Sequence, residues 1–326
     1  FGLKYSVYQF SPNIQYVKQD NGNISPVPPL PDLSHEFSSY MENSFSIRNF
    51  QFNLGIRQSA YNADTKNYLY LQPRFSAKYQ SPGNFSLSTT YTEMVQFMHL
   101  LTNSSLGLPT DLWVTSTDKT PPQKARQISM GFSSDYLEKF RFEVETYYKW
   151  MNNVIQFDEG TAYLNTTSNN WEENIVSGEG RAYGVELMTE KNEGKITGLA
   201  SYTLSWSERK FDELNSGNWF PFKYDRRHDF SLLTEFHFVE KYQRKKSLSF
   251  GLTVQSGNHL SIPDTEIKGF SGLGLDANDN YWQTRQTFNN PNNFKMPAFH
   301  HLDIAYNIEQ KKTASKSIIW SFSIYN

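Results

Sequence analysis

The chain has 326 residues, no cysteine, and a formal net charge of −2 that comes from interspersed acidic and basic residues. The lack of cysteine excludes disulfides, thiol catalysis and thiolate metal sites, and the nearly balanced charge excludes a basic surface for nucleic acid. Aromatic residues make up 16% of the chain, yet its mean hydropathy is −0.64. Strands with one ring-rich face toward lipid and one polar face toward water combine both properties. The composition therefore favours a transmembrane β-barrel.

We expect neither a helical membrane span nor a signal peptide within this sequence. No window holds the roughly 18 consecutive apolar residues that a spanning helix needs. The first residues, Phe1 to Tyr5, lack the basic start and apolar core of a signal peptide. If the chain lies in a membrane, it must therefore cross it with β-strands.

From its first residue, the chain repeatedly alternates apolar and polar side chains, which is the pattern of a strand with two different faces. The segments have about 9 to 14 residues, close to the roughly 9 to 11 tilted residues that cross a bilayer. We predict an all-β, antiparallel fold of about 13 strands, over residues 1 to 10, 35 to 45, 49 to 60, 68 to 79, 85 to 98, 123 to 134, 139 to 152, 178 to 190, 195 to 208, 227 to 238, 246 to 256, 298 to 309 and 317 to 326.

Residues 140 to 150 show the alternation most clearly. One face carries Phe140, Phe142, Val144, Thr146, Tyr148 and Trp150, and the other carries Arg141, Glu143, Glu145, Tyr147 and Lys149. So many charges on one side of a long strand fit a water-filled lumen better than the core of a sandwich. The same pattern recurs over residues 68 to 79, 195 to 208 and 248 to 255, with Leu199 as the one apolar exception on a polar face.

Short turns and longer loops alternate along the chain. The short connections are residues 46 to 48, 80 to 84, 135 to 138, 191 to 194, 239 to 245 and 310 to 316, and the longer ones are residues 11 to 34, 61 to 67, 99 to 122, 153 to 177, 209 to 226 and 257 to 297. Outer-membrane barrels sort short turns to the periplasmic side and longer loops to the outside, whereas a soluble sandwich has no reason to do so.

We interpret residues 1 to 326 as a single β-barrel domain that is a fragment. A closed bacterial barrel usually has an even number of strands, and the first and last predicted strands each still need a partner.

Four segments resemble the barrels of TonB-dependent receptors. The stretch Leu106-Gly107-Leu108-Pro109-Thr110-Asp111-Leu112-Trp113-Val114 is similar to an outer loop of the branch that carries a carboxypeptidase-regulatory-like domain before its plug. Three further segments resemble the same family in order and spacing, namely Val176 to Leu187, Tyr202 to Ser205 followed by Arg209 to Phe211, and Tyr224-Asp225-Arg226-Arg227-His228-Asp229.

The resemblance implies a barrel of about 22 strands in the cell outer membrane, closed around an N-terminal plug, that takes up a scarce nutrient with energy relayed by TonB. This chain would supply strands 9 to 21 of that barrel, surrounded by outer-membrane lipid. The plug, the segment that contacts TonB and the last strand would lie outside it. A surface lipoprotein is a further expected partner, a small nutrient is the expected ligand, and neither a cofactor nor enzymatic activity is expected.

The histidine and acidic clusters favour hydrogen bonding over metal binding or catalysis. His300 and His301 are adjacent, so on a strand they point to opposite faces and do not chelate one ion. His228, Asp229 and His237 lack a recognisable nucleophile and are expected to hydrogen-bond in the lumen. The segment Asp276 to Asn280 lacks the glycine and terminal glutamate of a calcium loop, and the glycines at 269, 272 and 274 lack the lysine of a phosphate cradle. We predict no metal site.

The ligand-binding candidates are aromatic and histidine side chains in the predicted outer loops, where rings could stack on a ligand. They are His99, Trp113, Trp171, Trp219, Tyr281 and Trp282. The alternative is that these rings pack the loops together, and Trp150 and Trp206 at strand ends fit an aromatic girdle at the membrane interface.

Two other functions stay open at this point. A passive outer-membrane channel would lack a folded plug. A soluble β-sandwich for binding or adhesion would pack the apolar strand faces against each other.

Overall fold

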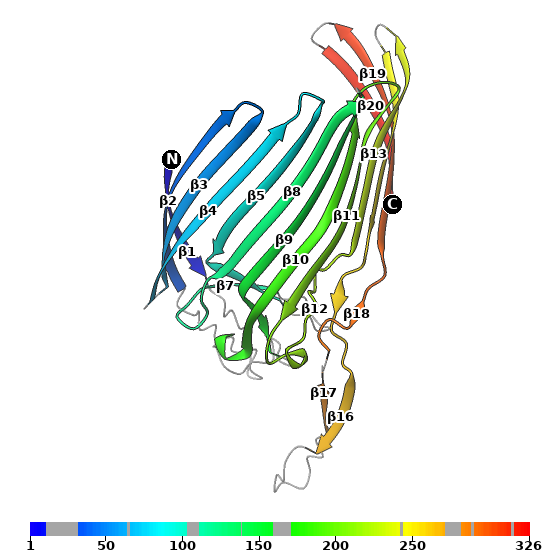
Figure 1. Ribbon diagram of the computed structural model, residues 1–326. Coiled ribbons are helices and arrows are strands. Elements are labelled where there is room, and N and C mark those ends of the chain that lie inside the picture. Colours follow the sequence, from blue (N-terminus) through cyan, green and yellow to red (C-terminus); the bar gives the residue numbers. More distant parts are fainter. Residues whose placement is uncertain are drawn as a thin grey trace.

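Thirteen antiparallel strands pair in chain order into one curved sheet in the computed structural model of the chain (Figure 1). The structure describes residues 1–10, 32–63, 66–102, 111–137, 139–158, 171–241, 244–270, 282–287, 290–313 and 316–326. The thirteen strands are β1 (Gly2–Phe10), β2 (Asp32–Ile47), β3 (Phe50–Ala63), β4 (Lys66–Gln80), β5 (Phe85–Gln96), β8 (Gln123–Leu137), β9 (Phe140–Phe157), β10 (Ile175–Lys191), β11 (Ile196–Lys210), β13 (His228–Lys241), β14 (Arg244–Gln255), β19 (Phe299–Thr313) and β20 (Lys316–Tyr325).

Each predicted strand coincides with one of these thirteen, so the all-β antiparallel prediction is confirmed. Short additional elements lie in the connections between them. These are the hairpin of β6 (Met98–Leu101) and β7 (Leu112–Thr115), the paired strands β15 (His259–Leu260) and β18 (Phe294–Lys295), the hairpin of β16 (Thr265–Phe270) and β17 (Trp282–Thr287), strand β12 (Phe220–Pro221) on β11, and the 3-10 turns η2 (Trp171–Asn174) and η3 (Asn215–Gly217).

The connections are sorted between the two ends of the sheet, as predicted. Figure 1 shows tight turns at one end of the strands, here called the turn end, and the additional short elements at the other end, here called the loop end. At the turn end, Arg48 and Asn84 adopt a positive φ of 53° and 61°, and Gly194 adopts 102°. A side chain at Gly194 would strain this conformation, which explains a glycine in the turn after β10.

The predicted longer loop over residues 61 to 67 is wrong. β3 and β4 stay in register up to the pair Ala63 and Lys66, so the connection is a short one at the loop end. Both strands extend because side chains near their connection pack together. The rings of Tyr61 and Phe97 stack with their centroids 4.5 Å apart, and Tyr68 belongs to the same buried cluster. Burial of large rings outweighs the turn-like polar sequence.

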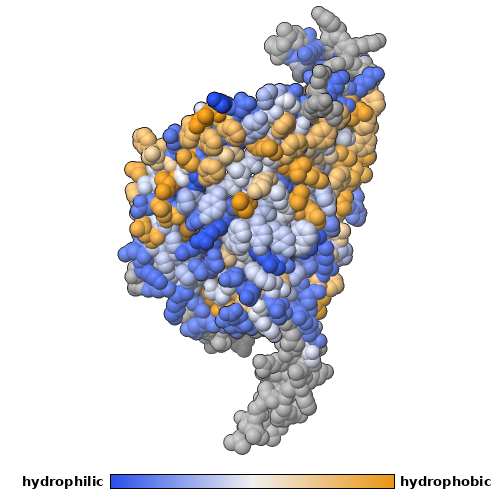
Figure 2. Space-filling view, viewed as in Figure 1, coloured by the Kyte–Doolittle hydropathy of each residue, from blue (hydrophilic) through white to orange (hydrophobic). Residues whose placement is uncertain are grey.

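One face of the sheet is apolar and exposed along its whole width. Leu87, Phe132, Val144 and Leu187 form one cross-strand row through the middle of this apolar face, and each is between 38% and 49% exposed. Figure 2 shows hydrophobic residues gathered mainly over the part of this face toward the turn end. A soluble protein does not expose so large a continuous apolar surface, so this face requires lipid.

Aromatic rings mark both borders of the apolar face on β9. Phe140 and Phe142 stack near the turn end, and Tyr148 packs against Trp150 toward the loop end. Ten residues separate Phe140 from Trp150, which is roughly 33 Å along a strand and about 25 Å along the membrane normal at a tilt of about 40°. That height matches the apolar band of an outer-membrane barrel.

The opposite, polar face carries paired charges and hydroxyl groups. The Glu36 carboxylate, whose side chain is 8% exposed, accepts hydrogen bonds from Tyr8 Oη and Ser38 Oγ at 2.7 Å each and from Arg57 Nη2 at 3.1 Å. Ser38 and Ser59 share a further hydrogen bond at 2.9 Å. The buried charge is thereby satisfied by three neighbouring strands.

The largest buried apolar clusters lie at the loop end, where loop segments fold onto the polar face. One cluster holds Leu101 and Val114 of the β6–β7 hairpin together with Ile155, Phe157 and Trp171. Tyr68 Oη donates to the Thr117 carbonyl at 2.8 Å, which ties the hairpin to the sheet. Within the described residues, no helix has the length and apolar character to cross a membrane.

His99 is enclosed in this loop layer. It is 1% exposed, its Nε2 lies 3.1 Å from Ser116 Oγ, and burial lowers its pKa from 6.5 to about 4. The imidazole is therefore neutral in the folded hairpin at neutral pH.

The two faces predict opposite responses to a new charge. Leu187→Arg, in the middle of the apolar face, is expected to destabilise the intact protein in lipid vesicles by about 2–4 kcal/mol in urea unfolding. The matched control is Met188→Arg, because Met188 lies on the polar face opposite Glu143 and its replacement should cost far less. Equal losses in the two variants would contradict the assignment of the faces.

The β6–β7 hairpin should loosen in acid. Because the folded pKa of His99 is depressed, protonation favours the open hairpin, so stability is constant above pH 6.5 and falls below it until about pH 4. At pH 5.5 we expect roughly tenfold faster hydrogen exchange in this hairpin than at pH 7.5, after correction for intrinsic rates. His99→Gln should remove the pH dependence; an unchanged dependence in this variant would refute the role of His99.

Candidate functional site

Two segments far apart in the sequence meet at the loop end. Asp111, just before β7, accepts hydrogen bonds from Lys223 Nζ at 3.1 Å and from Tyr224 Oη. Lys223 is 10% exposed at its side chain and Asp111 is 21% exposed. Burial and the Asp111 carboxylate together raise the pKa of Tyr224 to about 12, so the phenol stays a donor. We call Asp111, Lys223 and Tyr224 the loop latch.

The next residue, Asp225, fixes the second of these segments to the sheet. It is 1% exposed, and its Oδ1 accepts the backbone N–H of Ser207 at 2.7 Å. Arg227 Nη2 lies 3.3 Å from Oδ2, and His259 Nε2 lies 3.8 Å from the same oxygen. The buried charge therefore orders three segments at once: the one before β13, the end of β11 and the start of β15.

The glycines of β10 allow close packing at the same end. A Cβ on Gly178 would lie 2.2 Å from the Lys210 carbonyl oxygen, and one on Gly180 would lie 2.4 Å from Arg209 Nη1. The β9–β10 pairing shifts its register between Gly178 and Glu179. A side chain at Gly178 would collide with the backbone of β11, and one at Gly180 would displace the Arg209 guanidinium.

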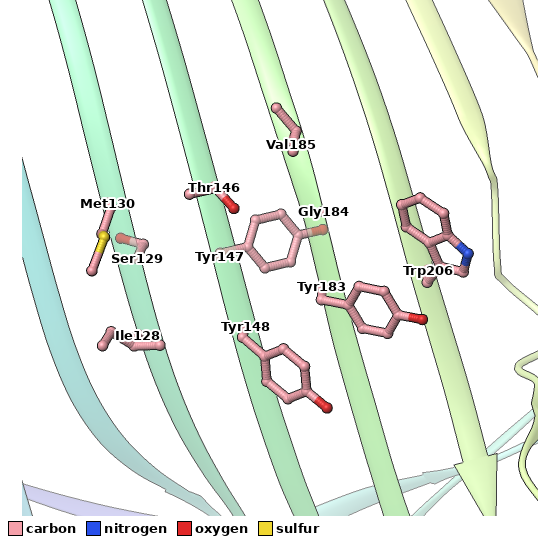
Figure 3. A pocket seen from close by; sticks show the side chains of 10 residues that line it. All are labelled: Ile128, Ser129, Met130, Thr146, Tyr147, Tyr148, Tyr183, Gly184, Val185 and Trp206. Carbon is pink, nitrogen blue, oxygen red and sulfur yellow. The ribbon is translucent and has the colours of Figure 1, made fainter.

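An aromatic row lies on the apolar face beside these glycines. Tyr148, Tyr183 and Trp206 stack in sequence with centroid distances of 5.4 Å and 5.2 Å, and they line a shallow groove (Figure 3). Arg181 pairs with Glu208 at 2.7 Å at the border toward the loops. Rings at the edge of a lipid-facing surface with charges beyond them fit an interfacial girdle.

The structure distributes the six candidate ligand-binding residues between different roles. Trp113 is 48% exposed, whereas Trp171 is 7% exposed inside a hydrophobic cluster. His99 is buried in the loop layer, and Trp219 is half-buried with the Arg181 guanidinium 4.3 Å from its ring. Trp113 is therefore the accessible ring among these four.

The remaining two candidates, Tyr281 and the side chain of Trp282, lie outside the described residues, as does the segment from Asp276 to Asn280.

The histidines follow the strand geometry. His300 and His301 pair with neighbouring residues of β14 and so occupy opposite faces; His301 Nε2 lies 2.8 Å from Asp303 Oδ1. The expectation that His228 faces the lumen is wrong, because its Nδ1 lies 2.8 Å from Oη of Tyr202 on the apolar face. Asp229 accepts from Gln255 at 2.7 Å on the polar face, as expected. The described part of the chain holds no cluster of three potential metal ligands among His, Asp and Glu.

The loop latch was missed as a candidate site. Asp111 and Tyr224 both lie in segments singled out for their resemblance to a family, but the sequence gives no sign that they touch across 113 positions.

Comparisons with solved structures connect this geometry to outer-membrane receptors. The chain is similar to the ferripyoverdine receptor of the Pseudomonas aeruginosa outer membrane, with 15% identity, a TM-score of 0.55 and coverage of 92% of this chain and 36% of that one. It is similar to the ferric-catecholate import receptor Fiu from E. coli K12, with 14% identity, a TM-score of 0.59 and coverage of 91% and 40%. It is also similar to BauA, the ferric preacinetobactin receptor from Acinetobacter baumannii, with 15% identity, a TM-score of 0.58 and coverage of 94% of this chain and 42% of that one.

These likenesses concern the fold, and the chain spans 36%, 40% and 42% of the lengths of the three receptors. No curated protein sequence matches the chain. The model of the family described as "TonB dependent receptor-like, beta-barrel" matches residues 1–326. With this match along its whole length, an apolar face of membrane height and loops gathered at one end, the chain belongs to the TonB-dependent receptor-like β-barrel family.

Proposed function

We propose that this chain forms part of the barrel wall and outer loops of a TonB-dependent receptor that actively imports a small nutrient. The observation that carries the proposal is the arrangement of the sheet: an apolar face of membrane height, a polar inner face, and loops folded over that inner face at one end. In a membrane, the apolar face contacts lipid, the polar face lines the lumen and the loop end meets the outside. Family membership places the chain in the outer membrane of a Gram-negative bacterium.

The rest of the transporter follows from the width of such a barrel. Among the described residues, β1 and β20 each pair on one side only, so we propose that further strands of a longer protein close the barrel. A barrel of about 22 strands encloses a wide lumen, and we propose that a plug domain of the same protein fills it. TonB would act on that plug through a segment outside this chain. The role of the chain is transport and not catalysis.

The ligand is proposed to enter from the loop end. The similar receptors named above are receptors for ferripyoverdine, for ferric catecholate and for ferric preacinetobactin. A small, soluble nutrient of that general size would reach the exposed Trp113 and the polar face between the loops. Residues 106 to 114 also support the branch with a carboxypeptidase-regulatory-like domain, and a surface lipoprotein over the loops is a further proposed partner.

Conductance separates active import from a passive channel. In a planar lipid bilayer, the intact protein is expected to show no steady open conductance, because a plug fills the lumen. In cells, cross-linking should capture TonB on the intact protein. A stable, large conductance without added energy would instead favour the passive channel.

The loop latch should hold the outer loops together. Asp111→Ala removes the acceptor for both Lys223 and Tyr224, and hydrogen bonds to a charged group contribute about 1.5–3 kcal/mol each, less where solvent reaches them. We expect at least fivefold faster hydrogen exchange in residues 112–116 and 220–225 of the intact protein. Asp118→Ala, in an exposed position of the same connection, is the control and should change neither segment.

Equal exchange in wild type and Asp111→Ala would show that other contacts carry the loop packing.

A further inference from the structure

Two positive side chains lie near each other on the polar face close to the loop end. Lys149 on β9 pairs in register with Ala182, and Arg209 on β11 pairs with Gly180. The two cations therefore flank β10 from opposite sides, at partners that are two residues apart on that strand. Both side chains are half-buried.

The floor between them is made of the smallest side chains. Gly180 and Ala182 both point to the polar face of β10, between the two cations. A Cβ at Gly180 would lie 3.2 Å from Arg209 Cζ, so the glycine lets the guanidinium lie directly on the strand. The Arg209 guanidinium therefore covers Gly180, and Lys149 lies beside Ala182, the next residue of β10 on this face.

Arg209 is held in a fixed orientation. The Phe222 ring lies 4.2 Å from its Cζ, and its Nη1 contacts the Glu208 carbonyl oxygen at 3.4 Å and Met151 Sδ at 3.8 Å. None of these contacts supplies a negative charge. Because Phe222 directly precedes Lys223, the loop latch also holds the ring that covers Arg209.

Neither cation has an acidic partner among the residues that the structure describes. Asp225 is the carboxylate that contacts β11 near this site. It already accepts the backbone N–H of Ser207 and pairs with Arg227. Two like charges held beside each other without a counter-charge are unfavourable, and an anion between them would offset both the repulsion and the partial loss of water.

Acidic residues occupy the same wall farther from the loops. Glu145 on β9 and Glu186 on β10 lie directly opposite each other on the polar face. Glu145 is four residues from Lys149 on the same strand, roughly 13 Å toward the turn end. Along β9 and β10, positive charge near the loop end is thus followed by negative charge, while Lys78 on β4 lies level with these carboxylates.

We propose that Lys149 and Arg209, which flank Ala182 of β10 on the polar face, form a binding subsite for an oxyanion, a carboxylate or phosphate group carried by the imported ligand. The assignment to an imported ligand rests on the proposed transport function. The subsite itself is a property of this wall and can be tested without transport. Arg209 supplies a planar, fixed pair of donors and Lys149 a mobile ammonium, which together suit an oxygen-rich anion.

The test uses inorganic phosphate as the probe and the reactivity of Lys149 as the readout. The intact protein in detergent is treated with an amine-acetylating reagent at pH 7.5, with increasing phosphate and with sodium chloride added to hold ionic strength constant. Peptide mass spectrometry follows acetylation of Lys149. Lys78, on the polar face of β4 and apart from Arg209, is the internal control.

We expect phosphate to slow acetylation of Lys149 at least fivefold and to leave Lys78 unchanged. Arg209→Gln should abolish the protection, and Arg209→Lys, which keeps the charge but not the planar fork, should keep part of it. Acetate in place of phosphate tests whether a carboxylate serves as well.

Three results would overturn the proposal: no effect of either anion on Lys149, full protection in Arg209→Gln, or a Lys149 that is already unreactive without added anion. The last result would mean that another part of the protein covers Lys149. A failure of energised transport would not change any of these readouts, so the two proposals can fail separately.

Discussion

Backbone hydrogen bonding in lipid is the constraint on which the rest of this structure depends. A hydrocarbon layer contains no water to satisfy N–H and C=O groups, so each strand that crosses it must pair with a neighbour on both sides. The strands from β2 to β19 do so in unbroken chain order, and β1 and β20 each have one described neighbour. Their side chains then alternate between lipid and lumen, which explains how a chain so rich in rings has a hydrophilic average composition.

The same constraint moves the packed core away from the sheet. Inside the membrane band, the wall is one layer thick, and its stability comes from strand pairing and from polar networks such as the one around Glu36. Conventional buried clusters form instead where loops fold back, around Trp171 and around Phe211 and Leu214. The described loop segments are therefore packed structures, held by the loop latch and by Asp225, rather than loose connections.

Sequence periodicity predicted the part of the fold that repeats and missed the part that does not. Alternation along residues 140 to 150 follows from strand geometry alone, so the two faces of β9 were predictable. The extension of β3 and β4 beyond residue 60 depends on Phe97, which comes from another connection, and no local pattern encodes that contact.

The same limit applied to the candidate site. Trp171 and His99 looked like accessible loop residues because loops usually lie at the surface, but each is buried by a hairpin that packs onto the sheet. The loop latch joins positions 111 and 224, and the cations Lys149 and Arg209 come to the same face only because β9 and β11 both pair with β10. Long-range pairing creates these sites, and single-sequence patterns do not report it.

The order of charges on the polar face bears on how import is driven. Under the proposed assignment, an anion held by Lys149 and Arg209 would meet Glu145 and Glu186 if it moved inward along β9 and β10, and these like charges oppose passage on that path. Diffusion along this wall would therefore favour retention at the outer mouth. Release toward the periplasm would need a change in what else lines the lumen, which is the step that energy from the inner membrane could supply. A wall that captures ligand at the outside and resists its passive descent suits an energised importer better than an open channel.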